Sequence, residues 1–140
     1  MEKRRMFRIL SGADAPTVAE LAWKATRQRN VTVIKEPGKT LTMIQMREPV
    51  RQSLFYLGEV IVSEAIVEID GVRGTAVTMG GDLDKALHMA IIDAACNKGI
   101  FAHEAELEAL EAEQEVRRQR ENALHLKTMV QFSSMDQEVL

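Results

Sequence analysis

The chain has 140 residues, of which 46% are hydrophobic and 28% charged, and this composition excludes a disordered tail. A chain of this length folds as one domain with a single buried core. Its net charge of −3 lacks the basic excess with which proteins bind duplex nucleic acid, so no nucleic-acid partner is expected.

The single cysteine, the charges near the N-terminus and the short apolar runs favour a cytoplasmic protein without a membrane partner. Cys96 is the one cysteine, so an intramolecular disulfide is excluded, and an unpaired thiol fits a reducing compartment. Near the N-terminus, Arg8, Asp14 and Glu20 interrupt any stretch that could serve as the apolar part of a signal peptide. The longest weakly charged apolar run, residues 83–92, is too short to cross a bilayer.

Residues 1–30 are predicted to form a helical N-terminal part with two short helices. Ser11-Gly12 ends the first helix, and Asp14 followed by Pro16 starts the second. The apolar stripes at helical spacing are Met6, Ile9 and Leu10 in the first helix and Val18, Leu21, Ala22 and Ala25 in the second. Trp23 lies off its stripe, and we expect it to cover an edge of the core.

Residues 31–80 are predicted to form an antiparallel sheet of about four strands. A β-branched run begins at residue 31, and Pro37-Gly38 is expected to turn the chain. A second strand covers residues 41–46, and a long extended stretch, with Gly58 as a bulge or bend, covers residues 53–69.

The dipeptide Asp70-Gly71 predicts a two-residue hairpin turn of type I′. The turn sets the register, with the pairs Ile69–Val72, Glu68–Arg73, Val67–Gly74 and Ala65–Ala76. The first, third and fourth of these pairs lie on one face of the hairpin. The side chains of this face are apolar, and they become small toward the end that lies away from the turn. A helix is therefore expected to approach this face closely.

Residues 82–99 are predicted to be that packed helix, with Asp82 as its N-cap and Gly99 as the left-handed residue at its end. Gly80 and Gly81 precede the helix and could let a phosphate reach free backbone N–H groups. We favour a plain turn with a cap, because the phosphate-loop spacing is absent and Lys85 is the only cation expected nearby.

Residues 103–132 are predicted to form a long C-terminal helix, acidic in its first half and basic in its second, followed by a frayed end at residues 133–140. Such a helix would be roughly 45 Å long, more than a domain of this size covers. Its candidate interface is an alanine-rich seam of heptad spacing: Ala105, Ala109, Ala112, Val116, Ala123, Leu126 and Val130. Folding back across the domain and binding a partner are equally compatible with this pattern.

Catalytic and metal-binding patterns are weak in this sequence. His88, His103 and His125 lie far apart and never at ligand spacing, so no metal site is expected. His88 is expected to be half-buried. Cys96 lies in an apolar helical stripe, where burial raises the pKa of a thiol. An independent enzyme would have to use Glu59 or His88.

Several short motifs, spread over nearly the whole chain, resemble the PhnG family. They are LTMIQMR at residues 41–47, FYLGE at 55–59, AIVEIDG at 65–71, GGD at 80–82 with Ala86 and IDA at 92–94, and KTMV at 127–130. The chain departs from the family pattern at Gly81, where the family has Arg, at residues 85–87 (KAL), where it has His-Ala-Glu, and at residues 63–64 (SE), where it has Thr-Arg.

The resemblance implies an enzyme subunit without a cofactor of its own. PhnG subunits belong to a transferase complex with PhnH-, PhnI- and PhnJ-like partners. This complex attaches a phosphonate to ribose C1 of ATP and displaces adenine, giving a ribose 1-phosphonate 5-triphosphate. The candidate substrate-proximal residues of this chain are Arg47, Gly58, Glu59, Gly80, Asp82 and Lys85.

Residues 1–140 are accordingly expected to be a single α+β domain of PhnG type with a scaffolding role and no catalytic side chain. Self-association of the isolated chain is also expected. The alternative is a stand-alone homo-oligomeric binding or structural protein of the same fold.

Overall fold

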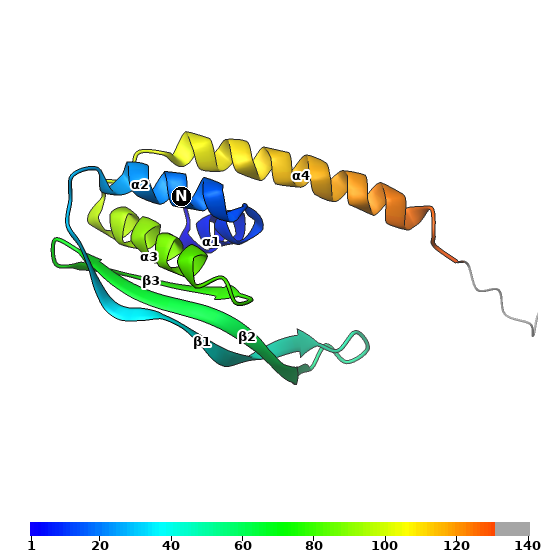
Figure 1. Ribbon diagram of the computed structural model, residues 1–140. Coiled ribbons are helices and arrows are strands. Elements are labelled where there is room, and N and C mark those ends of the chain that lie inside the picture. Colours follow the sequence, from blue (N-terminus) through cyan, green and yellow to red (C-terminus); the bar gives the residue numbers. More distant parts are fainter. Residues whose placement is uncertain (131–140) are drawn as a thin grey trace, which may run out of the picture.

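The computed structural model describes residues 1–130, which form an α+β fold with four helices and a three-stranded antiparallel sheet (Figure 1). The elements are α1 (Lys3–Gly12), α2 (Ala15–Thr26), β1 (Val31–Arg47), β2 (Leu54–Ile69), β3 (Val72–Met79), α3 (Leu83–Lys98) and α4 (Glu104–Leu126). The sheet forms one layer, α3 lies on it, and α1 and α2 separate α3 from α4 (Figure 1). The expected fold class is confirmed.

The β2–β3 hairpin follows the predicted register at every pair, from Ile69–Val72 to Ala65–Ala76. Asp70 and Gly71 have positive φ angles of 48° and 84°, which is the conformation that a type I′ turn requires. Because this turn leaves no freedom in strand alignment, the apolar face was predictable from the sequence. The residues of that face on β2 are buried.

The prediction of a turn at Pro37-Gly38 is wrong. β1 continues through both residues as one strand paired with β2, and its register shifts between Val33 and Lys35 and again between Lys35 and Gly38. These shifts absorb the extra residues as bulges. Proline is tolerated because β1 lies at the edge of the sheet, where a missing N–H need not break a ladder. The sheet therefore has three strands rather than four.

Helix α3 packs directly on the sheet, as predicted. The side chain of Asp82 caps it by accepting a hydrogen bond from the backbone N–H of Lys85 at 3.1 Å, and Gly99 ends it with a φ of 81°. The buried carboxylate of Asp93 accepts a hydrogen bond from the Thr75 N–H at 3.0 Å and so ties α3 to β3. Gly74 is buried under the helix and allows its backbone to come close.

The apolar stripes of α1 and α2 are buried as predicted, and α2 packs against α3. Trp23, in contrast, is 79% exposed and does not cover the core edge. It lies off the stripe of α2, and α2 turns that stripe toward α3. The expectation for Trp23 is therefore wrong.

Helix α4 is shorter than the expected range 103–132. It ends at Leu126, residues 127–130 are not helical, and residues 131–132 and the expected frayed end at 133–140 lie outside the described residues. Its 23 residues still give a length of about 35 Å. In Figure 1, α4 runs past the ends of α1 and α3, so its second half projects from the body of the molecule.

Candidate functional site

Three of the candidate substrate-proximal residues lie on a projecting β arm, defined here as residues 39–61 of β1, β2 and the turn between them. The third strand stops at the base of this arm, where Met79 pairs with Val62 and the Gly80 N–H donates to the Ile61 carbonyl at 3.0 Å. Gly58 and Glu59 lie along the arm. Arg47 lies near its tip and donates a hydrogen bond to the Gln52 carbonyl at 2.7 Å.

The other three candidates, Gly80, Asp82 and Lys85, lie at the N-terminus of α3. The carboxylate of Asp82 is occupied by the helix cap. The ammonium of Lys85 donates to the carbonyls of Ser11 and Ala13, both at 2.8 Å, and so holds the end of α1. Both side chains therefore have structural partners, in agreement with the plain turn-and-cap interpretation.

Lys39 is a cation near the Gly80-Gly81 turn that the sequence analysis missed. A Cβ built on Gly81 would lie 3.0 Å from Cε of Lys39, so the expectation that Lys85 is the only nearby cation is wrong. The missing signal was the register of β1, in which Lys39 pairs with Ser63 close to the end of β3.

The six candidates do not converge on one site within this chain. Arg47 lies six residues along β1 from Leu41, which pairs with Ile61 at the base of the arm, and six strand residues span about 20 Å. The arm tip and the α3 N-terminus are thus separate. Contact of any of these residues with substrate stays a prediction.

His88 is one of the two residues that an independent enzyme would have to use, and the other, Glu59, lies on the β arm. His88 is half-buried as expected and lines a hollow of about 310 Å³ together with Trp23 and Arg29, and no carboxylate lines this hollow.

Within residues 1–130, no group of three or more His, Cys, Asp or Glu side chains could hold a metal ion. None of the helices in this range is both long and apolar enough to span a membrane.

Cys96 is expected to react slowly with alkylating reagents. Burial, reinforced by the negative charges of Asp93 and Glu104, raises the pKa of its thiol from 9.0 to about 11. At this higher pKa the fraction of Cys96 present as thiolate at pH 8 is roughly 100-fold smaller, and the thiolate is the reactive form. We expect iodoacetamide to modify native Cys96 at least about 100-fold more slowly than the urea-unfolded chain, as measured by mass spectrometry. Equal rates in both states would contradict the burial.

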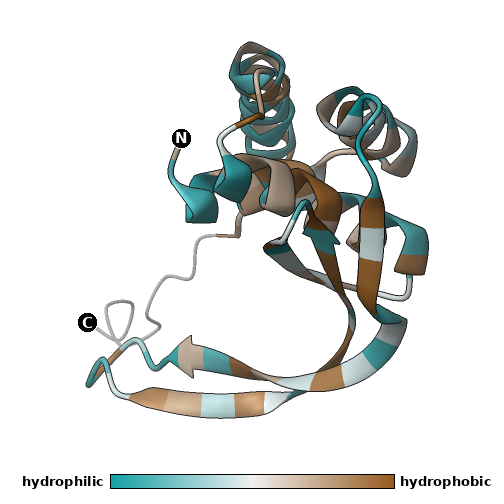
Figure 2. Ribbon diagram, turned by 90° about the vertical axis from the view of Figure 1, so that its left-hand side faces the viewer, coloured by the Kyte–Doolittle hydropathy of each residue, from teal (hydrophilic) through white to brown (hydrophobic). Residues whose placement is uncertain are grey.

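The β arm carries exposed apolar side chains on both faces. By the alternation of the strands, Leu41, Met43 and Ile61 lie on the face that continues the helix-covered side of the sheet, whereas Met46 and its partner Phe55 lie on the opposite face. Their exposed fractions range from 43% for Phe55 to 60% for Leu41. Figure 2 shows the apolar bands of this ribbon extending away from the helices. Neither face of the arm is covered by the described part of the chain.

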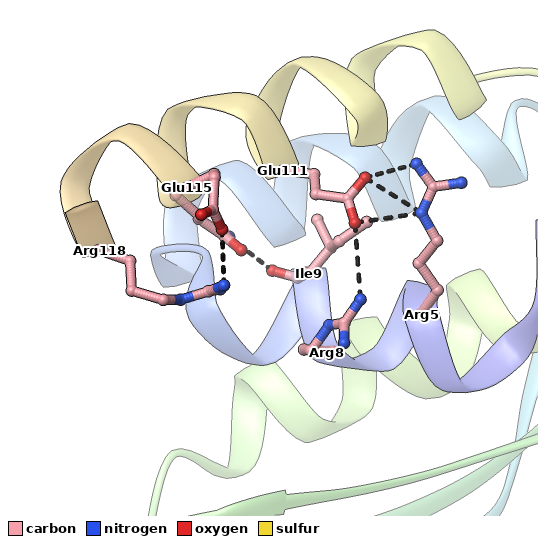
Figure 3. Close-up of polar contacts among 7 residues, drawn as sticks. Arg5, Arg8, Ile9, Glu111, Glu115 and Arg118 are labelled. Carbon is pink, nitrogen blue, oxygen red and sulfur yellow. Dashed lines mark hydrogen bonds and ion pairs between the residues drawn. The ribbon is translucent and has the colours of Figure 1, made fainter.

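The first half of α4 is fixed to the body of the protein (Figure 3). Leu107 is fully buried, and the Gln114 side chain donates to the Ile9 carbonyl at 2.8 Å. The guanidinium of Arg5 donates two hydrogen bonds of 3.0 and 3.1 Å from Nε to Glu111, and this hydrogen bonding lowers the pKa of the carboxyl. The anchoring residues thus recur along one face of α4.

The alanine-rich seam lies on a different face of α4 and remains exposed throughout. At 100° per residue, Ala112 and Ala123 lie nearly opposite Leu107 on the helix. The exposed members are Ala105, Ala109, Ala112, Val116, Ala123 and Leu126, together with Val130 beyond the helix. Folding back and partner binding are therefore compatible, because they use different faces of α4.

A family model described as "Phosphonate metabolism protein PhnG" matches residues 1–137. No curated protein matches the chain.

Proposed function

Because the chain belongs to the PhnG family of phosphonate metabolism proteins, we propose that it is a scaffold subunit of the complex that transfers a phosphonate to ribose C1 of ATP. In this reaction the phosphonate displaces adenine, and the product is a ribose 1-phosphonate 5-triphosphate. ATP and the phosphonate bind at the level of the complex with PhnH-, PhnI- and PhnJ-like subunits. The chain itself supplies binding surfaces and no cofactor.

The observation that carries this proposal is the β arm with apolar side chains on both faces. An isolated two-stranded ribbon is at best marginally stable in water. Contiguous exposed apolar surface in a folded protein is typical of sites that bind another protein. The arm therefore favours a subunit whose fold is completed by association.

The engagement of the polar candidates supports scaffolding over catalysis. Asp82 caps α3, and Lys85 holds the end of α1. Lys85, the cation of the two, could bind a triphosphate only by giving up its contacts with the end of α1. Glu59 is exposed on the arm, where an assembled partner could bring it to a site that this chain does not form alone.

Co-expression with PhnH-, PhnI- and PhnJ-like subunits tests the proposal. We expect the chain to co-elute with them in size-exclusion chromatography, and the assembled set to release adenine from ATP with methylphosphonate. The purified chain alone should release none. Elution of the chain apart from all three companions would contradict the proposal.

The same arm would also suit a stand-alone homo-oligomeric structural protein, because a second copy could cover part of it. That alternative predicts a monodisperse oligomer of the single chain that does not exchange with companion subunits. An independent enzyme is the third candidate, and it requires adenine release by the chain alone that Glu59→Gln abolishes.

A further inference from the structure

The β arm and the second half of α4 project on the same side of the molecule (Figure 1). The last hydrogen bond from α4 to another element runs from Arg117 to the Gly12 carbonyl at 3.5 Å. Among the described residues, the side-chain hydrogen bonds and ion pairs of residues 118–130 stay within this segment or reach back to Glu115. Both projections thus extend beyond the core, one from the helical layer and one from the sheet (Figure 1).

The charges of α4 are sorted according to these two halves. Its acidic first half is partly paired with the body of the protein: Glu106 pairs with Lys24 at 3.2 Å, and Glu111 pairs with Arg5. Residues 116–130 carry four basic side chains against one acidic one. Of these basic groups, only Arg118 has an ion pair among the described residues, and its partner Glu115 belongs to the same helix.

The unmatched positive charges border exposed apolar side chains. Arg120 follows Val116 by four residues, and Lys127 follows Ala123 by four, so both lie next to the alanine-rich seam. Val116 and Leu126 are 55% and 64% exposed. The end of α4 therefore presents an apolar strip with a basic border.

The charge of the α4 end and the free strand edges of the β arm favour binding of a different protein over binding of a second copy of this chain. A second copy would bring an equally basic α4 end, and like charges across an interface oppose association. The arm has two free strand edges in the described part of the chain: the outer edge of β1, and the edge of β2 over residues 54–61, which β3 does not reach. A two-fold contact between two arms would pair only one of these edges. A partner with a groove can cover both faces of the arm at once.

We propose that both projections hold one companion protein of different sequence. This partner presents an apolar groove with a free strand edge to the β arm, and acidic side chains around an apolar patch to the end of α4. Strand addition supplies backbone hydrogen bonds at the arm, and opposite charges orient the partner along α4. The inference rests on the proposed function and names the surfaces through which the subunit assembles.

Two double variants test the two surfaces separately. Arg120→Glu with Lys127→Glu reverses the border of α4, and its matched control, Arg120→Lys with Lys127→Arg, keeps the charge. Leu41→Ser with Met43→Ser removes apolar surface from the arm, and its control, Leu41→Ile with Met43→Leu, retains it. All four side chains are exposed, so circular dichroism should show an unchanged fold.

Binding of each purified variant to the co-purified PhnH-, PhnI- and PhnJ-like set is then measured by biolayer interferometry at two salt concentrations. We expect Kd to rise at least about 10-fold for the charge reversal and about 100-fold for the arm variant, and to stay near wild type for both controls. The charge reversal should also remove most of the salt dependence.

The outcomes separate this inference from the proposed function. Wild-type binding that both test variants retain overturns the inference and leaves the proposed function standing. If just one of the two test variants loses binding, the partner uses a single projection, and the inference that it uses both is overturned. A wild-type chain that binds no companion overturns the proposed function itself. A dimer of the chain that the arm variant dissociates, without any effect on companion binding, would assign the arm to a second copy.

Discussion

Replacing Gly74 with alanine is expected to lower the free energy of unfolding by more than about 3 kcal/mol. A Cβ at this position would lie 2.3 Å from the Ala90 carbonyl oxygen and 2.3 Å from the Ala94 nitrogen. Both are backbone atoms of α3 and cannot rotate away, so the whole helix would have to lift from the sheet. Urea unfolding followed by circular dichroism measures the loss.

Gly58→Ala provides the matched control for Gly74→Ala. Nothing lies within 4 Å of a Cβ built on Gly58, and its φ is not positive. Since alanine costs less backbone entropy than glycine in a strand, this variant should lie within about 0.5 kcal/mol of wild type or slightly above it. Similar stability of the two variants would contradict the close approach of α3 to β3.

Leu107→Ala is expected to cost about 3 kcal/mol of stability and to loosen α4 from the body of the protein. Leu107 is the only fully buried residue of α4. Its removal leaves a cavity at the main apolar contact of the helix. Urea unfolding measures the stability, and hydrogen exchange of the α4 amides measures the loosening.

Leu124→Ala removes the same atoms from the projecting half of α4, where the side chain is 56% exposed. This control should change stability by less than about 0.5 kcal/mol. If Leu107→Ala also stayed within that range, α4 would be held mainly by its ion pairs and not by Leu107. Unchanged hydrogen exchange in Leu107→Ala would argue the same way.

The parts of the fold that were predictable from sequence are those governed by local rules. Asp70-Gly71 fixed the alignment of β2 and β3, because a two-residue type I′ turn admits one register. Asp82 and Gly99 marked the ends of α3, because each satisfies backbone groups that a helix leaves unpaired. These signals depend on a few neighbouring residues and need no tertiary information.

The errors arose where a local signal competes with tertiary structure. Pro37-Gly38 is a common turn pair, but bulges in an edge strand accommodated it. In α4 the most regular apolar pattern is the alanine-rich seam, but Leu107 anchors the helix from another face. Alanine buries little area, so its periodicity does not reveal which face meets the core.

The candidate site could be predicted only as a set of positions. Sequence placed Asp82 and Lys85 beside a helix start, and the structure shows their side chains engaged in holding that start and the end of α1. It could not place Arg47 about 20 Å away along the arm, because that distance depends on how far β1 and β2 extend beyond β3. Spatial convergence was the missing information.

The unpaired strand edges of the β arm also have a consequence for protein production. An open, apolar edge accepts any extended segment that it meets, including the arm of an identical molecule or a partly folded chain. Chain whose arm is left uncovered would then accumulate as aggregate when it is produced at high concentration.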